Sequence, residues 1–256
     1  MHWQHNTNKV LRHCALSACL LACLSSLSSS AVTQNMLVLE QTHRMYGRAT
    51  VYISHDAVKV VGRDRDFRFL ATAPGWDALL YSDGRKIVHR FPFKQWSASG
   101  IKTALNSLED NDVYLTAPPK LEKQQQYAGV TAQVLSFYDN SVNRAPKKMA
   151  DYWTSTSPKF PVSEDACRVL CAIWCTRPKN GLPLRFRVMK VTGFTSSNFG
   201  SLRDSHLVTD LQTTAIKSVP YDRHVLAAPV GYKNVGDGDI FVGQKDLHDL
   251  EEVLGE

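Results

Sequence analysis

Hydrophobic and polar residues alternate along several segments of the chain, and this pattern constrains the fold more than any other feature. The clearest case places Ala49, Val51 and Ile53 on one face of an extended segment. Such alternation predicts strands that turn one face to a core and the other to water. Similar segments recur at residues 67–72, 87–91, 130–134 and 184–188. Their spacing indicates about ten strands, mostly antiparallel, as in a sandwich or barrel.

Turn and helix signals place the connections between these strands. Asp83-Gly84 favours a tight hairpin turn, because Asp-Gly suits the primed turn types. Helices are predicted over residues 99–109, 163–174 and 244–254. Ser163 caps the second of them, and two acidic residues follow it at the positive end of the helix dipole. Since no internal repeat and no shift in composition is visible, residues 34–256 are expected to form a single domain with a short C-terminal helix.

The first 31 residues have the pattern of a targeting segment. Two basic residues precede an apolar run, residues 14–23, which is too short for a spanning helix of ~20 residues. Small residues before and at Ala31 predict a signal peptide over residues 1–31. Residues 20–23 (LLAC) also resemble a bacterial lipobox, in which Cys23 is lipidated and cleavage occurs before it. Both endings stay open. Either one predicts export to the periplasm or cell envelope, and the second adds a lipid anchor in the membrane.

Charge and motif content exclude several classes of function. Without residues 1–31 the chain has 28 Lys and Arg against 24 Asp and Glu, which is a net charge of +4 spread along the sequence. Basic residues do not cluster between aromatic ones, so we expect no nucleic-acid partner. No His, Cys or carboxylate spacing matches a metal site, and no nucleophile motif is present. We therefore expect no enzyme, no catalytic residue, no metal and no cofactor.

Three cysteines lie on the second predicted helix. Cys167, Cys171 and Cys175 share one stripe with Leu170 and Trp174. This stripe favours packing in the core, because cysteine is among the most buried residue types. A disulfide, or metal or redox chemistry, is the alternative. We expect Cys167 and Cys171 to face the sheet. Replacement of Cys171 by Ser should then destabilise the fold by about 1–3 kcal/mol, more than Ala, because its hydroxyl would be buried without a partner.

Several stretches of sequence occur in an order that resembles a known family. A strand meander over residues 50–96 is followed by a helix, further strands and a covering helix. The later stretches are residues 181–184 (GLPL), 215–220 (AIKSVP) and 228–233 (APVGYK). This order resembles an uncharacterised family of bacterial exported proteins that is similar to the lipoprotein-localisation carriers and receptors, the LolA/LolB-like fold. The resemblance covers most of residues 36–235.

The resemblance implies a mainly β fold with a few helices, in which a strongly curved antiparallel sheet forms an open half-barrel covered on its concave side by helices. It also implies non-catalytic binding of an apolar ligand, such as a lipid or acyl chain, in the cavity between sheet and helices. The inward residues expected to line this cavity are Val51, Ile53, Phe67, Phe69, Leu80, Ile87, Phe91, Leu184, Phe186 and Val188.

The alternative is a structural or protein-interaction domain of the envelope, with a filled core and no ligand. A cavity of ~300–1,000 Å³ would favour the ligand, because binding pockets have that size. A filled interior would favour the alternative.

Overall fold

In the computed structural model, the described residues are 35–96, 118–139, 147–156, 160, 162–176, 181–191, 205–236 and 238–241. The targeting segment, Cys23 and the helices predicted at residues 99–109 and 244–254 lie outside these ranges. The described strands and helices belong to one unit, Gln34–Glu256.

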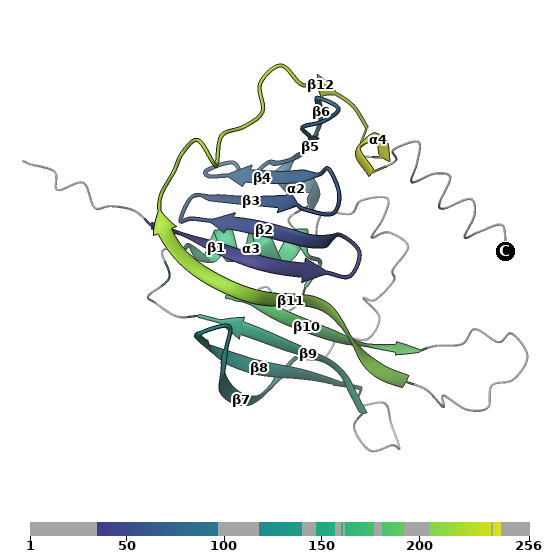
Figure 1. Ribbon diagram of the computed structural model, residues 1–256. Coiled ribbons are helices and arrows are strands. Elements are labelled where there is room, and N and C mark those ends of the chain that lie inside the picture. The colour runs from purple at the N-terminus through teal and green to yellow at the C-terminus, as the bar shows by residue number, and fades with distance from the viewer. Residues whose placement is uncertain are drawn as a thin grey trace, which may run out of the picture. The chain divides into compact units, whose positions relative to one another are not determined.

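Twelve strands form a single sheet in the order β12-β6-β5-β4-β3-β2-β1-β11-β10-β9-β8-β7 (Figure 1). All neighbours pair antiparallel except β12 and β6, which are parallel. The strands are β1 (Asn35–His43), β2 (Gly47–Ile53), β3 (Ala57–Gly62), β4 (Arg68–Thr72), β5 (Ala78–Ser82), β6 (Ile87–Phe91), β7 (Lys120–Tyr127), β8 (Val130–Asp139), β9 (Lys147–Ser155), β10 (Leu182–Val191), β11 (Ser205–Pro220) and β12 (Lys233–Asn234).

The alternating segments pair in register, so their hydrophobic residues meet on one face of the sheet, here called the inward face. Val51 of β2 lies opposite Leu39 of β1 and Val60 of β3, and all three are fully buried. Residues that are directly opposite in an antiparallel pair share a face, which extends this apolar surface from strand to strand. The Asp83-Gly84 turn joins β5 to β6 as predicted, and the Gly84 amide donates to Asp66.

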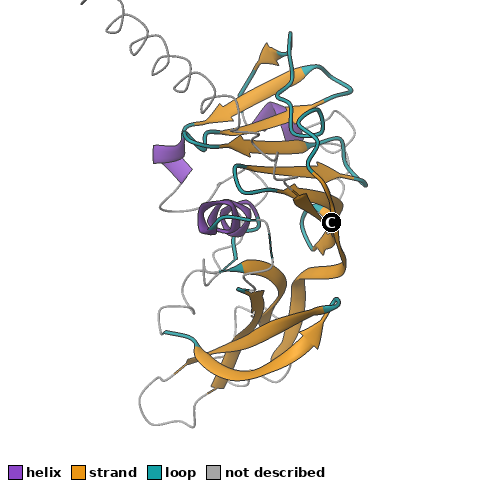
Figure 2. Ribbon diagram, turned by 90° about the vertical axis from the view of Figure 1, so that its left-hand side faces the viewer, coloured by secondary structure: helices purple, strands orange, loops and turns teal. Residues whose placement is uncertain are grey.

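One helix of ten residues, α3 (Glu164–Ile173), packs on the inward face and contacts β3 and β10. Figure 2 shows this helix in end view beside the sheet. The other described helices, α2 (Phe93–Trp96) and α4 (Gly238–Phe241), have four residues each. None of the described helices has the length and apolarity that a bilayer span needs.

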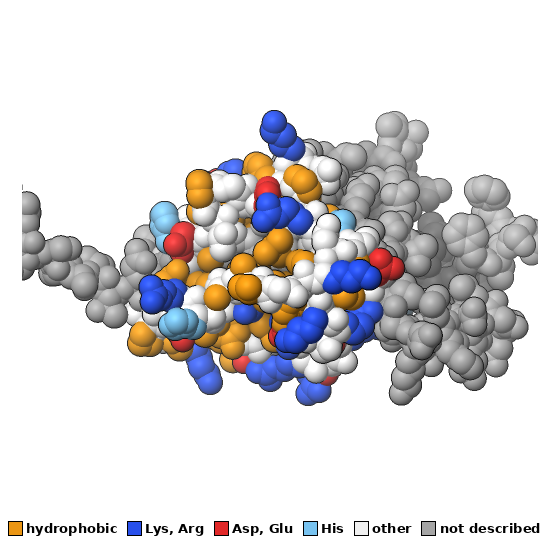
Figure 3. All heavy atoms as spheres, turned by 90° about the horizontal axis from the view of Figure 1, so that it is seen from above, with side chains coloured by type: hydrophobic (Ala, Val, Ile, Leu, Met, Phe, Trp, Pro, Cys, Tyr) orange, Lys and Arg blue, Asp and Glu red, His pale blue; other side chains and the backbone are white. Residues whose placement is uncertain are grey.

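The opposite face of the sheet, here called the outer face, is partly covered by the segment after β11. Leu226 packs there against Met36 and Ala57, and the carbonyl of Val225 accepts a hydrogen bond from Lys59 Nζ at 2.7 Å. Figure 3 views the molecule from the end of the sheet at which β12 lies. Hydrophobic side chains gather in the middle of that surface, with Lys and Arg side chains around them.

The predicted half-barrel with helices over its concave side is wrong. The structure has one open sheet of twelve strands that helices do not cover. Geometry gives the reason: α3 is about 15 Å long at 1.5 Å per residue, whereas twelve strands spaced ~4.8 Å apart extend over roughly 50 Å. Alternation identifies which residues face inward, but it carries no information about how much of that face a helix covers.

Candidate functional site

The ten residues expected to line a ligand cavity do share the inward face, and they are packed. Nine are buried in one hydrophobic cluster, and Ile87 is half-buried against it. The same cluster contains Leu170 of α3 and Trp174, which directly follows the last residue of the helix. The side chains on this face therefore fill the space next to them with one another and with the helix. Their contact with a ligand stays a prediction.

Two features hold helix α3 on this face: the cap at its N-terminus and the buried side chains along one side of the helix. Ser163 caps the helix, since its hydroxyl accepts a hydrogen bond from the Ala166 amide at 3.1 Å. Cys171 is fully buried, and its Sγ lies 3.3 Å from the Tyr152 hydroxyl of β9. The expectation that Cys171 faces the sheet is confirmed. The expectation that Cys175 packs in the core on the same stripe is wrong, because Cys175 lies beyond the last helical residue and is exposed.

A buried polar network beneath α3 was not predicted from the sequence. Gln41 of β1 accepts a hydrogen bond from Trp174 Nε1 at 2.7 Å, and it donates to the Pro183 carbonyl and the Thr213 hydroxyl. His43 stacks on Trp174 with ring centroids 5.1 Å apart. Burial, as the largest cause, lowers the pKa of His43 to about 4, so its ring is neutral near pH 7.

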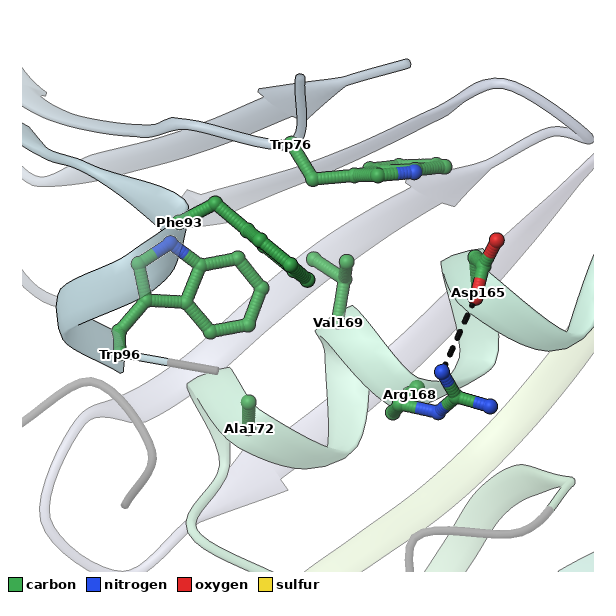
Figure 4. Close-up of a pocket in the computed structure, with 7 residues that line it drawn as sticks. All are labelled: Trp76, Phe93, Trp96, Asp165, Arg168, Val169 and Ala172. Atoms are coloured by element: carbon green, nitrogen blue, oxygen red, sulfur yellow. Dashed lines mark hydrogen bonds and ion pairs between the residues drawn. The ribbon is translucent and has the colours of Figure 1, made fainter. Parts of the chain in front are cut away.

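A small pocket lies between α2, α3 and the turn after β4 (Figure 4). Its volume is about 20 Å³, which holds about one water molecule and is far below the ~300–1,000 Å³ of ligand pockets. The indole nitrogen of Trp96 is buried there, and no described residue gives it a hydrogen-bond partner. The pocket is therefore a packing defect between aromatic side chains rather than a ligand site. Its lining residues are Trp76, Phe93, Trp96, Asp165, Arg168, Val169 and Ala172.

The outer face of β7, β9 and β10 carries a cluster of aromatic and basic side chains. The guanidinium groups of Arg185 and Arg187 lie 5.0 Å and 4.9 Å from the centre of the Trp153 ring. The Tyr127 ring of β7 is 6.4 Å from the same indole. We call these four residues the Trp153 patch. Trp153 itself is only 5% exposed, because the neighbouring side chains cover it.

Asp151 is a buried carboxylate next to this patch. It accepts hydrogen bonds from Ser136 at 2.7 Å and from Arg187, and it forms an ion pair with Lys148 at 3.0 Å. Burial raises the pKa of Asp151, but these hydrogen bonds and charges outweigh burial and hold the pKa below its usual value. Asp151 therefore stays ionised and engages Arg187.

Arg185 lacks such an acidic partner. Within the described part of the chain it contacts the Trp153 ring and makes no hydrogen bond or ion pair. Four buried polar atoms of the patch have no hydrogen-bond partner among the residues that the structure describes: Tyr127 Oη, Trp153 Nε1, Arg185 Nε and Arg187 Nε. Guanidinium and indole nitrogens only donate, so what this patch lacks is an acceptor.

Two further observations concern metal binding and thiol chemistry in the described part of the chain. Among the described residues, no group of three His, Cys, Asp or Glu side chains is placed to hold a metal ion. The pKa of Cys167 is raised to about 12, chiefly by burial, so this thiol is a poor nucleophile.

Comparisons with known proteins give distant structural likenesses. No family model matches the sequence, and no curated protein matches it. An uncharacterised conserved protein from Thermus thermophilus has a TM-score of 0.41 and 11% identity, over 85% of this chain and 98% of that chain. MucB in complex with MucA(peri) has a TM-score of 0.32 and 15% identity, over 81% of this chain.

The MucA/MucB complex of Pseudomonas aeruginosa has a TM-score of 0.29 and 14% identity, over 79% of this chain. In both complexes the chain spans 59% of the length of the chain that it matches. At these TM-scores nothing about function follows from the likeness. The resemblance to the lipoprotein-localisation carriers stays a prediction.

Proposed function

We propose that the chain is a non-catalytic protein-interaction domain of an exported cell-envelope protein. The observation that carries this proposal is the filled inward face. Nine of the ten side chains expected to line a ligand cavity are buried against one another and against α3. Because side chains fill the interior, a binding partner would contact the surface of the sheet. Export rests on the targeting pattern of residues 1–31.

The outer surface supports the proposal. Trp, Tyr and Arg dominate the binding energy of protein interfaces, because they bury large areas and form directed polar contacts. The Trp153 patch contains all three residue types on one face of the sheet. The edge strand β7 lies beside it, and its first five residues are exposed.

Binding of a lipid or acyl chain is the second candidate, because the inward face is apolar over many strands. Each buried CH₂ of a guest would contribute ~0.8 kcal/mol. The guest would, however, have to displace side chains such as Phe69 and Leu80, which are fully buried in the core. The filled core therefore favours the protein-interaction domain.

Two measurements on the full chain decide between these functions. The delipidated protein is titrated with a fluorescent fatty acid at micromolar concentration, and we expect no saturable binding. In cells, a photo-crosslinking amino acid is placed at Val230 or Leu121, which are 90% and 52% exposed, and at buried Phe69 as the control.

We expect crosslinks to another protein from a surface position and none from position 69. Saturable fatty-acid binding together with no protein crosslink from either surface position would overturn the proposal.

A further inference from the structure

The loop between β11 and β12 contains a stretch that no backbone hydrogen bond holds. Residues 221–232 form this loop and belong to no helix or strand (Figure 1). The Ala227 amide donates to the His224 carbonyl at 3.3 Å, and the next backbone bond along the chain begins at the Lys233 amide. Among the described residues, none gives residues 228–232 a backbone hydrogen bond. This stretch can therefore change its path without breaking the hydrogen bonds of the sheet.

The side chains of this stretch are small and apolar, and they are accessible. Residues 227–231 read AAPVG. Val230 is 90% exposed, more than any other large hydrophobic side chain that the structure describes, and Ala227 and Ala228 are exposed as well. Exposed loops with small side chains are preferred sites of proteolytic cleavage.

The residue types around Val230 indicate which endopeptidase could cleave there. Endopeptidases select a bond chiefly through a pocket for the side chain that precedes it, and a small apolar pocket accepts a small aliphatic side chain. Val230 has such a side chain, and Gly231 adds none on the other side of the bond. The bond between Val230 and Gly231 therefore suits an enzyme with a small apolar pocket.

The residues after this bond close one edge of the sheet. β12 lies beside β6 and is the last strand in the sheet order. Two backbone amides of this segment donate to β6 or to the residue before it at 2.9 Å, Lys233 to the Lys86 carbonyl and Val235 to the Val88 carbonyl. The Val235 carbonyl also lies 2.7 Å from His89 Nδ1. Without this segment, β6 would be the last of the described strands on this side.

Side chains add further contacts to the same segment. The Tyr232 hydroxyl donates to Asp83 at 2.7 Å, and the Arg85 guanidinium donates to the carbonyls of Asp239 and Ile240 in α4. In the intact chain all these contacts are intramolecular, which gives the segment an effective concentration on the order of millimolar. A break in the chain before Tyr232 removes this advantage.

We propose that the Val230–Gly231 bond is the cleavage site of an endopeptidase with a pocket for small aliphatic side chains, and that cleavage releases the following residues from the edge of β6. The reaction is a hydrolysis. The amide bond breaks, water adds OH to the Val230 carbonyl carbon and H to the Gly231 nitrogen, and the new acid gives its proton to the new amine. The freed edge of β6 could then pair with an extended segment of another chain. This inference goes beyond the proposed function.

The test digests the purified full chain with pancreatic elastase, a protease with a small pocket. We expect mass spectrometry to detect the fragment 231–256. Val230→Asp should slow its formation about tenfold or more, because an apolar pocket does not accept a carboxylate. Val230→Ala should be cleaved faster than Val230→Asp. Since position 230 is exposed, both variants should keep the urea midpoint of the wild type.

Leu121→Asp is the matched control, because it introduces the same charge at an exposed aliphatic residue that lies in the paired strand β7. It should leave the rate of fragment formation unchanged. After cleavage, gel filtration should separate the fragment from the rest of the protein. Hydrogen exchange should become faster in β6 and stay unchanged in β1. In cells, an epitope tag after Glu256 should reveal the same fragment from the wild type and none from Val230→Asp.

Equal rates of fragment formation from the wild type and Val230→Asp would overturn the cleavage site, and so would cells in which the tagged fragment never forms. A fragment that stays bound to the cleaved protein would overturn its release from β6. Crosslinks from Leu121 test the proposed function separately, because this residue lies outside the cleaved loop.

Discussion

His43 is a residue whose burial has a measurable consequence. Its pKa of about 4 in the folded protein lies below the unfolded value of 6.5. The unfolded chain therefore binds more protons between these two values, and the stability falls as the pH decreases from 6.5 to 4. We expect His43 to account for a loss of up to roughly 3 kcal/mol over this interval, at 1.36 kcal/mol per pKa unit.

His43→Phe should remove this part of the pH dependence, because Phe keeps the stack on Trp174 and cannot be protonated. Urea unfolding of the wild type and of His43→Phe at pH 7, 5.5 and 4 measures how the stability of each protein depends on pH. His55→Phe is the control, since His55 is exposed. Parallel stability curves for the wild type and His43→Phe would contradict the prediction.

Cys171 changes an expectation drawn from the sequence. A buried serine hydroxyl at this position would not lack partners, because the Tyr152 hydroxyl lies 3.3 Å and the Gly181 carbonyl 3.7 Å from the sulfur. We now expect Cys171→Ser to cost no more than Cys171→Ala. Each should cost about 1 kcal/mol, the net contribution of a typical hydrogen bond. Urea denaturation compares them, and a serine variant less stable than the alanine variant would disprove this order.

Single residues were predictable where their role is local. The Ser163 cap and the inward direction of Cys171 follow from spacing along one helix. The Trp153 patch could not be predicted from spacing along one element, although Arg185 and Arg187 could be placed on the outer side of their strand. It depends on which strands pair, and in which register β8, β9 and β10 meet. No local pattern contains that information.

The α3 helix depends on its cap at the level of the element. Ser163 has extended backbone angles, and its hydroxyl accepts from the Ala166 amide. Ser163→Ala should destabilise the protein by about 1 kcal/mol, because a helix N–H loses its acceptor. Ser163→Thr keeps a hydroxyl that can accept from the Ala166 amide and donate to the His55 carbonyl, so it should restore most of this loss. The measurement is the urea midpoint, and equal midpoints for all three proteins would exclude a stabilising cap.

Strands could be predicted from the sequence where the residues of one face are exposed to solvent and those of the other face are buried. β10 follows this rule, because Leu184, Phe186 and Val188 are buried as expected and the residues between them are half-buried. β9 does not alternate, because Met149 to Ser155 are buried on both faces. β7 does not alternate either, since most of its residues are exposed. In sequence, a strand buried on both faces resembles any core segment, and a strand exposed on both faces resembles a loop. Such segments are recognised as strands only from the strands with which they pair.

At the level of the whole molecule, β1 and β11 join the early strands to the late ones. β1 pairs with β2 on one side and with β11 on the other, so the sheet is continuous across this seam. Gln41 strengthens the seam, because its side chain links β1 to Pro183 of β10, Thr213 of β11 and Trp174 next to α3. A single buried amide thus links β1 to two other strands and to the residue that follows α3.

Gln41→Ala should therefore destabilise the entire sheet. It leaves the Trp174 N–H and the Pro183 carbonyl without this partner, at about 1–3 kcal/mol for each buried group. If the sheet unfolds as one unit, hydrogen exchange measured by mass spectrometry should show the same loss of protection in β3 and in β9. Gln212→Ala, on the exposed side of β11, is the control and should leave the protection of β3 and of β9 unchanged. A loss confined to the strands on one side of the β1–β11 seam would show that the two halves of the sheet unfold independently.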